Sequence, residues 1–248
     1  MKRKLLFLSL GLISVWQVQS QPAGSVYASR IHTAIIIDGQ LNEPAWQKTM
    51  PKSLDYFYGV EQPSDRQQTE VKLLWDDENV YISFYCKDKY LTARERTRNG
   101  KTFFDDCAEV FITPASGIGR MHFGFEVNLY KTPNDFIYVS QFIDGKSGVV
   151  KSYNPAYELG VYYQGTLNNN EDVDMGWSME MALPLQLFHN PKTFVKAEIG
   201  AKWTVMIVRQ DRNEVSGTRR TSSVMFPLED SVANIHTPSN FGWLKFVE

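Results

Sequence analysis

Hydrophobic and polar residues alternate along much of this chain with a period of two, which is the period of β-strands. The clearest segment is 122–130, where every second residue is apolar and His122, Glu126 and Asn128 share the opposite face. Similar short segments recur between Gly, Asn, Asp and Pro residues, and sustained helical periods are scarce. The pattern predicts an all-β protein, a two-sheet antiparallel β-sandwich with short helical turns.

Individual segments predict individual elements. A first strand is expected at His32–Ile37, after a polar lead-in at 21–30. Asn42 is expected to cap a short helix that carries Trp46 into the core. The other expected elements are strands at Cys107–Thr113, His122–Tyr130, Phe136–Ile143, Ala156–Gly165, Gly176–Leu183, Trp203–Asp211 and Gly242–Val247, and a helical turn at Pro184–His189.

Residues 69–86 predict a β-hairpin about the polar turn 76–79. One face of its second strand is apolar and ends at Cys86, while Ser83 and Tyr85 share the other face. We therefore expect the apolar face to pack in the core.

The two cysteines, Cys86 and Cys107, stand at the end of one predicted strand and at the start of the next. Antiparallel pairing of these strands would bring the thiols close, and oxidising conditions would allow them to join. Two alternatives stay open, a Cys86–Cys107 disulfide or two small buried thiols, because a bridge needs Cα atoms within about 7 Å.

The N-terminus has a different pattern. Basic residues precede a nearly unbroken apolar run, Leu5–Trp16, and Val18 and Ser20 then suit the two positions that signal peptidase reads. We expect residues 1–20 to be a signal peptide, residues 21–248 to be one domain, and the protein to be periplasmic or extracellular. The run is shorter than the roughly 20 residues that span a bilayer, so we expect no membrane span.

The charge of the chain bears on its partners. The formal net charge is −2, and it becomes −5 when the three basic residues of the signal segment are removed. A chain with this balance has no basic footprint, so neither nucleic acid nor an anionic membrane surface is an expected partner.

Common catalytic motifs do not occur in the sequence, which has no nucleophile elbow, Walker loop, dinucleotide fingerprint or zinc-protease motif. The four histidines lack the spacing of metal ligands, and no metal site is identified. Glu109 and Glu126 lie on neighbouring predicted strands, so paired-carboxylate glycoside hydrolysis stays open. The same carboxylates would also accept hydrogen bonds from sugar hydroxyls, and binding requires fewer assumptions.

Six segments in a fixed order carry a resemblance to a known family. They are IDGQLNEPAW (37–46), VKLLWDDENVYISFYCKD (71–88), FFDDCAEVFI (103–112), FEVN (125–128), GWSMEMALP (176–184) and FGWLKF (241–246). Together they resemble the family 9 carbohydrate-binding modules, of the DOMON-like β-sandwich superfamily. The resemblance implies a non-catalytic protein linked to glycan catabolism, in which two aromatic rings enclose a sugar and structural calcium supports the fold.

By position, the resemblance implies specific ligand contacts. Phe103 falls where the first stacking tryptophan stands, Glu109 on the acidic contact position and Asn128 on the contact asparagine. Glu126 stands where well-known sugar binders have arginine. Ile235 stands where the second stacking tryptophan is expected, and an aliphatic side chain offers no flat ring.

Two further hypotheses remain. Arg209, in the RQDR segment, is predicted either to face the same cleft or to be an ordinary solvent-facing strand end. A haem-binding protein is a third functional class, because DOMON domains hold haem through Met and His or Lys ligands. Met121, His122 and Met206 are conceivable ligands, although no spacing selects them.

Overall fold

The computed structural model describes residues 24–58, 66–115, 120–143, 146–188, 194–216, 220–228 and 234–248. The strands in these ranges are β1 Ser25–Arg30, β2 Lys52–Ser53, β3 Tyr56–Tyr58, β4 Thr69–Trp75, β5 Asn79–Lys87, β6 Cys107–Thr113, β7 Met121–Asn128, β8 Pro133–Ile143, β9 Lys146–Val150, β10 Glu158–Gln164, β11 Gly176–Pro184, β12 Lys202–Arg212, β13 Arg220–Val224 and β14 Gly242–Val247. The helices are α1 Pro44–Lys48 and the 3₁₀ turns η1 Thr102–Phe104, η2 Leu185–Phe188 and η3 Pro238–Asn240. The predicted signal peptide lies outside the described residues.

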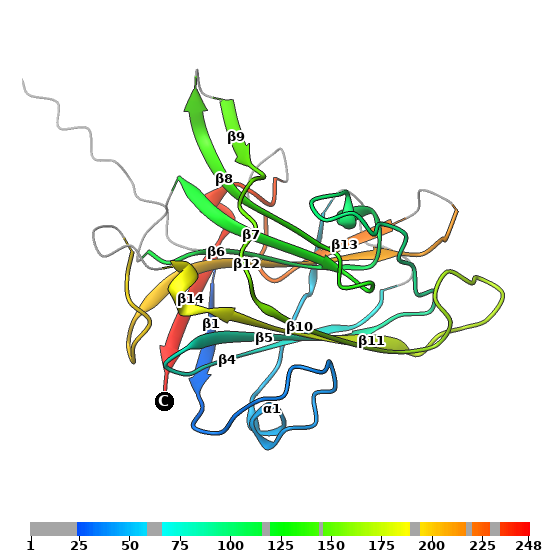
Figure 1. Cartoon of the computed structure of the whole chain (residues 1–248), viewed down its shortest axis with the longest axis horizontal. Helices are drawn as coiled ribbons and strands as arrows, with labels where there is room; N and C mark the ends of the chain where they lie inside the picture. The colour runs from blue at the N-terminus through cyan, green and yellow to red at the C-terminus, as the bar shows by residue number, and fades with distance from the viewer. Residues whose placement is uncertain are drawn as a thin grey trace, which may run out of the picture.

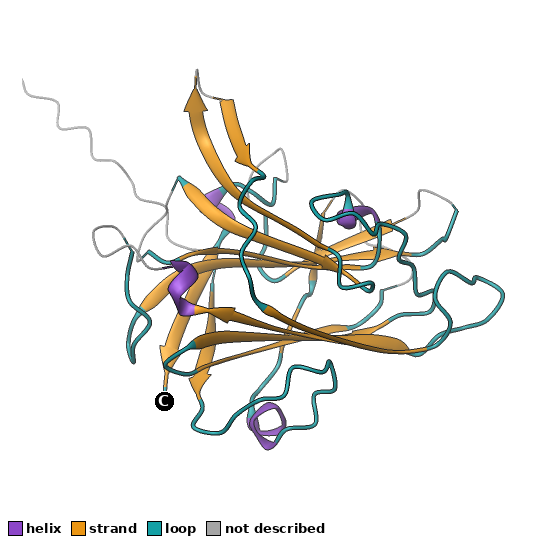
Figure 2. Ribbon diagram, viewed as in Figure 1, coloured by secondary structure: helices purple, strands orange, loops and turns teal. Residues whose placement is uncertain are grey.

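The strands form two layers that face each other, seen edge-on in Figure 1. The lower layer has the order β10–β11–β5–β4, and the upper layer contains β12–β6–β7–β8–β9, with β13 and β3 continuing from β12. β1 and β14 connect the two layers, so that hydrogen bonding is continuous between them. Strands dominate the described chain, and helices are few and short, as Figure 2 shows. The predicted all-β sandwich is confirmed.

The structure differs from the predicted pattern at its first strand. β1 is Ser25–Arg30, and it pairs in parallel with both β4 and β14, whereas the other strand pairs of the described chain are antiparallel. The segment 32–37 forms no strand, and Ile36 is exposed. Residues 25–30 form a strand because β4 and β14 pair with them on either side. The β-branched composition of 32–37 does not make that segment a strand.

Most other predicted elements are present. The hairpin is β4–β5, β6 has the predicted bounds, and η2 is the predicted helical turn. α1 buries Trp46 as expected, but its N-cap is Glu43 and not Asn42. No helix among the described residues has the length and apolarity needed to cross a membrane.

The apolar faces of the two layers meet in one core. Phe84 and Trp177 enter it from the lower layer, and Phe125 and Trp203 enter it from the upper layer. Figure 1 shows α1 on the outer side of the lower layer. A second cluster lies there, in which Trp46 of α1 packs with Leu74 of β4 and Tyr81 of β5.

The two cysteines lie on strands that do not pair. β5 pairs with β4 and β11, whereas β6 pairs with β12 and β7, so the antiparallel pairing on which a disulfide would depend is not present. Cys86 and Cys107 are both buried free thiols. The disulfide alternative is therefore wrong for this structure, and the alternative of two small buried thiols describes it.

Candidate functional site

A polar row crosses the outer face of the upper layer. Glu109 on β6 is the register partner of Glu126 on β7, and Glu126 is the partner of Asn134 on β8. Side chains opposite each other in neighbouring strands lie on one face, with Cβ atoms about 4.5–5.5 Å apart. All three side chains are buried, although the sequence pattern placed Glu126 on a face opposite to the core.

Hydrogen bonds link this row to its neighbours. Asn134 Nδ2 donates to Glu126 Oε2 (2.5 Å), and Lys151 Nζ donates to Asn134 Oδ1 (2.8 Å). On β12, Gln210 Nε2 donates to Glu109 Oε1 (3.0 Å). Carboxylates and amides thus form two hydrogen-bonded groups side by side, Gln210 with Glu109 and Glu126 with Asn134, and such groups can orient a polar ligand.

Burial raises the pKa of Glu126 to about 7. The hydrogen bond from Asn134 and the charge of Lys151 act in the opposite direction, and the nearby charge of Asp135 adds to the rise. Near neutral pH, Glu126 is therefore divided between its protonated and ionised forms, and it can donate as well as accept a hydrogen bond.

The stability of the protein should change with pH through Glu126. Its folded-state pKa of about 7 lies above the ordinary 4.5, so the folded state binds the proton more tightly and this stabilisation is lost as pH rises through about 7. Between these two pKa values, the wild-type protein should lose about 1–3 kcal/mol of unfolding free energy relative to Glu126→Gln. Urea unfolding at a series of pH values measures this difference, which includes the charge coupling between Glu126 and Asp135. A pH-independent difference would contradict the prediction.

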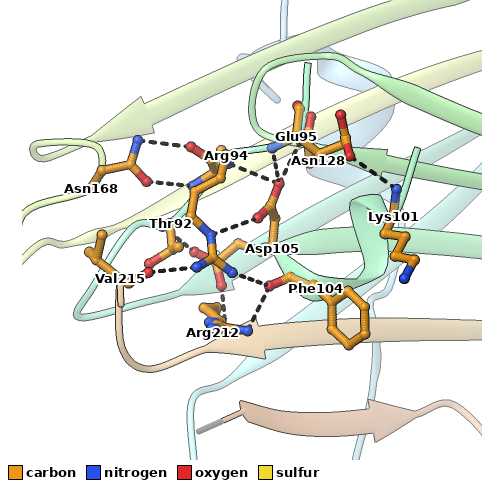
Figure 3. A network of polar contacts seen from close by, with 12 residues as sticks. Thr92, Arg94, Glu95, Lys101, Phe104, Asp105, Asn128, Asn168, Arg212 and Val215 are labelled. Atoms are coloured by element: carbon orange, nitrogen blue, oxygen red, sulfur yellow. Dashed lines mark hydrogen bonds and ion pairs between the residues drawn. The ribbon is translucent and has the colours of Figure 1, made fainter. Parts of the chain in front are cut away.

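Asn128 holds the loop that precedes β6. Its Nδ2 donates to the carbonyl oxygen of Glu95 (2.8 Å) and to Asp105 Oδ2 (2.9 Å), as Figure 3 shows in part. Its Oδ1 accepts hydrogen bonds from the backbone N–H groups of Tyr130 (3.1 Å) and Thr132 (3.0 Å). The amide that the resemblance assigns to the ligand is therefore fully engaged inside the protein.

The same loop is fixed by Asp105 and Arg212. Asp105 Oδ2 also accepts the backbone N–H groups of Arg94 and Glu95, both at 2.9 Å (Figure 3). Arg212 Nη1 donates to the carbonyl oxygen of Phe104 (3.1 Å). These contacts hold η1 at the edge of the upper layer.

η1 presents two aromatic rings. The ring centroids of Phe103 and Phe104 are 4.7 Å apart, Phe103 is half-buried, and Phe104 is 38% exposed. The resemblance assigns stacking to Phe103, and the structure adds the more exposed ring of Phe104 beside it.

The position of the second stacking ring is occupied differently. Ile235 is half-buried, and its neighbour His236 stacks on His122 with ring centroids 5.3 Å apart and 8° between the planes. His122 Nε2 and His236 Nδ1 are 3.2 Å apart. Burial lowers the pKa of His236 to about 4 and that of His122 well below its ordinary value, so both rings are neutral near pH 7. Sequence analysis did not predict this contact between the two histidines, because 114 positions separate them.

The haem hypothesis gains no support from these positions. His122 is engaged with His236, and Met206 is fully buried on β12.

Arg209 lies on the opposite face of the upper layer from the polar row. Because neighbouring residues of a strand face opposite ways, Gln210 contacts Glu109 while Arg209 points between the layers. There its guanidinium donates to Asp88 Oδ2 (2.9 Å) and Thr69 Oγ1 (3.0 Å). The prediction that Arg209 faces the ligand cleft is therefore not what the structure shows, and neither is a solvent-facing strand end.

Asp88, Asp106 and Asp211 surround this guanidinium. Their carboxylate oxygens lie within 4.8 Å of one another, and all three residues are buried. Burial, followed by the charges of Asp88 and Asp211, raises the pKa of Asp106 well above its ordinary value. Clustered carboxylate oxygens fit calcium. The resemblance implies structural calcium, which stays a prediction. Among the residues that the structure describes, these three would hold it, in competition with Arg209.

Solved structures share this fold. A family 9 carbohydrate-binding module from Caldicellulosiruptor kristjanssonii in complex with cellotriose has a TM-score of 0.58 and 16% identity, covering 90% of this chain and 93% of that one. A family 9 module from the same organism in complex with glucose has a TM-score of 0.57 and 15% identity, covering 90% of this chain and 95% of that one. A candidate carbohydrate-binding protein from Bacteroides uniformis has a TM-score of 0.59 and 16% identity, covering 90% of this chain and 99% of that one. No curated protein has a significant sequence match.

Fold and site together define a β-sandwich with a polar row and an aromatic edge on one outer face. Residues 37–248 match the family model described as carbohydrate family 9 binding domain-like, and the chain belongs to that family. The resemblance found in the sequence is confirmed.

Proposed function

We propose that this protein is an exported, non-catalytic carbohydrate-binding protein that serves glycan catabolism. The observation that carries the proposal is the row Glu109–Glu126–Asn134 on one face of β6, β7 and β8, together with the rings of η1, which contacts β6 and β7. Family membership supports it, as do the solved modules described with cellotriose and glucose.

The proposed site combines stacking with hydrogen bonding. The C–H face of a pyranose packs on an aromatic ring, here Phe104 with Phe103 behind it, while its hydroxyls reach the polar row. Since Ile235 and His236 stand at the second ring position, stacking is expected on one side of the sugar only.

Export is supported by the N-terminal pattern alone. A cut after Ser20 would leave Gln21 as the first residue. Mass spectrometry of the protein recovered from the periplasm or medium would check this, and an intact Met1 would contradict it.

Sugar binding should depend on Glu109. The change Glu109→Gln keeps the shape and the acceptor for Gln210 but removes the charge that strengthens hydrogen bonds from hydroxyls. On a broad glycan array with calcium present, we expect binding by the wild type and about tenfold or greater weakening by the variant.

Glu158→Gln, on the edge strand β10, is the matched control and should bind as the wild type does. Thermal melting verifies that each variant is folded. No glycan bound by the wild type, or equal binding by Glu109→Gln, would overturn the proposal.

Hydrolysis is the second candidate, since Glu109 and Glu126 form a cross-strand pair and burial raises the pKa of Glu126 to about 7. Retaining glycosidases place two carboxyl groups about 5–5.5 Å apart, on either side of the scissile bond. Here both side chains rise from one sheet face, which favours binding. We expect no new reducing ends when a bound glycan is incubated with the protein, and their release would favour the enzyme.

A further inference from the structure

A hollow of about 480 Å³ lies on the outer face of the lower layer, on the far side of the sandwich from the polar row. Its floor is formed by outward-facing side chains of β4, β5, β11 and β10, and its wall by residues 40–47. Figure 1 shows α1 on this side, beneath β4 and β5. None of the residues of the proposed sugar site lines it.

Four residues in register form the floor. Glu70, Tyr85, Ser178 and Tyr162 are successive partners on β4, β5, β11 and β10. Three strand spacings of about 4.8 Å make this row about 14 Å long. Tyr85 is 45% exposed and Tyr162 is 41% exposed, so both rings are accessible.

The wall of the hollow is held in place by Glu180. Its Oε1 accepts the indole N–H of Trp46 (2.7 Å), and its Oε2 accepts the backbone N–H groups of Gly39 (2.7 Å) and Asp38 (3.1 Å). Gly39 has φ +92°, and a Cβ there would lie 2.5 Å from the backbone nitrogen of Tyr162. The segment therefore approaches β10 closely, and the hollow exists before any ligand binds.

The hydroxyl of Ser83 indicates that the hollow binds a ligand. Its side chain lines the hollow and is 1% exposed, and its hydroxyl has no hydrogen-bond partner among the residues that the structure describes. Ser178 on the same face differs, because its hydroxyl donates to the carbonyl oxygen of Gly39. A buried hydroxyl without a partner is unfavourable, and a ligand hydroxyl placed in the hollow would satisfy it.

The lining combines apolar side chains with hydrogen-bonding groups, and its charges are balanced. Its charged side chains are Glu70 and Lys72, of opposite sign, and Lys72 Nζ donates to the carbonyl oxygen of Trp46 (2.7 Å). Carboxamides such as those of Asn42 and Gln164 join the serine and tyrosine hydroxyls. Accessible rings among neutral hydrogen-bonding groups suit a neutral ligand that has apolar faces and many hydroxyls. We infer that this hollow is a second saccharide-binding site.

The two sites share no residue, so the second does not depend on the proposed function of the first. Because they lie on opposite faces of the sandwich, one molecule would hold two glycan chains at once. Such a molecule would link two separate glycan chains without a second protein.

The test uses the purified chain with the first site disabled by Glu109→Gln, or by Phe104→Ala if the first variant does not fold. The probes are arrayed neutral oligosaccharides of glucose, xylose, mannose and galactose, with oligogalacturonate as the charged comparison. We expect this chain to retain at least one neutral oligosaccharide, and Tyr162→Ala to weaken that binding about tenfold or more. Tyr163→Ala is the matched control, since Tyr163 is 39% exposed on the same strand but faces the other way and does not line the hollow.

Ser83→Ala separates binding from folding. Because its hydroxyl has no partner in the structure, the variant should keep or raise the thermal midpoint while its affinity falls. The inference is overturned if no neutral oligosaccharide binds once the first site is disabled, or if Tyr162→Ala and Tyr163→Ala bind equally. If the first site is the one that fails, Glu109→Gln and wild type bind alike and Tyr162→Ala alone abolishes binding.

Discussion

Replacing Arg209 by methionine should lower the free energy of unfolding by about 3–5 kcal/mol at neutral pH. The side chain is 1% exposed and donates to Asp88 and Thr69 between the layers. Methionine keeps much of the volume but leaves the buried carboxylates of Asp88, Asp106 and Asp211 without the positive charge that faces them. Urea unfolding of the two proteins measures the difference. The cost should shrink on acidification, because burial raises the pKa of Asp106 well above its ordinary value and protonation of this carboxylate removes part of the repulsion.

Arg30→Met is the matched control for this change. Arg30 also pairs with an aspartate, Asp77, at 2.7 Å, but the Asp77 side chain is 82% exposed, so the expected cost is below about 1 kcal/mol. A similarly small cost for Arg209→Met would refute the buried-charge account.

Millimolar calcium should raise the thermal midpoint of Arg209→Met more than that of the wild type, since calcium then has no guanidinium to displace. An equal effect on both proteins would count against calcium at these three aspartates.

Replacing Asn128 by alanine should cost about 2–4 kcal/mol of unfolding free energy. The change removes both donors to Glu95 and Asp105 and the acceptor for Tyr130 and Thr132, all of which are part-buried or buried contacts. Because these contacts fix the loop that carries η1, sugar affinity should fall together with stability. Chemical unfolding and glycan titration of the same preparation measure the two effects.

The control for this prediction is Asn169→Ala. Asn169 makes a local, exposed hydrogen bond to the backbone of Glu171, so its loss should change stability by less than about 0.5 kcal/mol. A stable Asn128→Ala protein that had lost sugar binding would show that Asn128 contacts the ligand directly, and would refute the structural role. Glu109→Gln is therefore the cleaner probe of the sugar site.

Alternation along the strands was sufficient to predict much of the fold and part of the site. Strand period two places Glu126 and the other polar residues of β7 on one face, and the sequence placed Glu109 on a neighbouring strand. The structure adds that Glu109 and Glu126 are register partners. The same rule did not predict that the C-terminal end of β12, which carries Arg209, is buried. Arg209 was interpreted as a cleft or solvent residue because its partner Asp88 stands 121 positions away, and tertiary contact alone makes burial of the pair tolerable.

Other features of the structure cannot be predicted from the pattern of hydrophobic and polar residues. β1 has a weak apolar pattern and is a strand because β4 and β14 pair with it on both sides. Ser83 and Tyr85 were placed on the polar face of a hairpin, where a solvated surface and the floor of a hollow give the same pattern. The distinction comes from residues 40–47, which cover that face through contacts with Glu180.

The parallel pairing of β1 has a consequence for when the protein can finish folding. One neighbour of β1 is β14, which lies more than two hundred residues later in the chain, so the junction of the two layers closes only after the C-terminal strand has been synthesised. Contacts of such long sequence separation form slowly, because the loop-closure entropy must be lost before the contacts stabilise the chain. A chain that completes its fold late stays unfolded for longer during synthesis, which is the state that the proposed export would require.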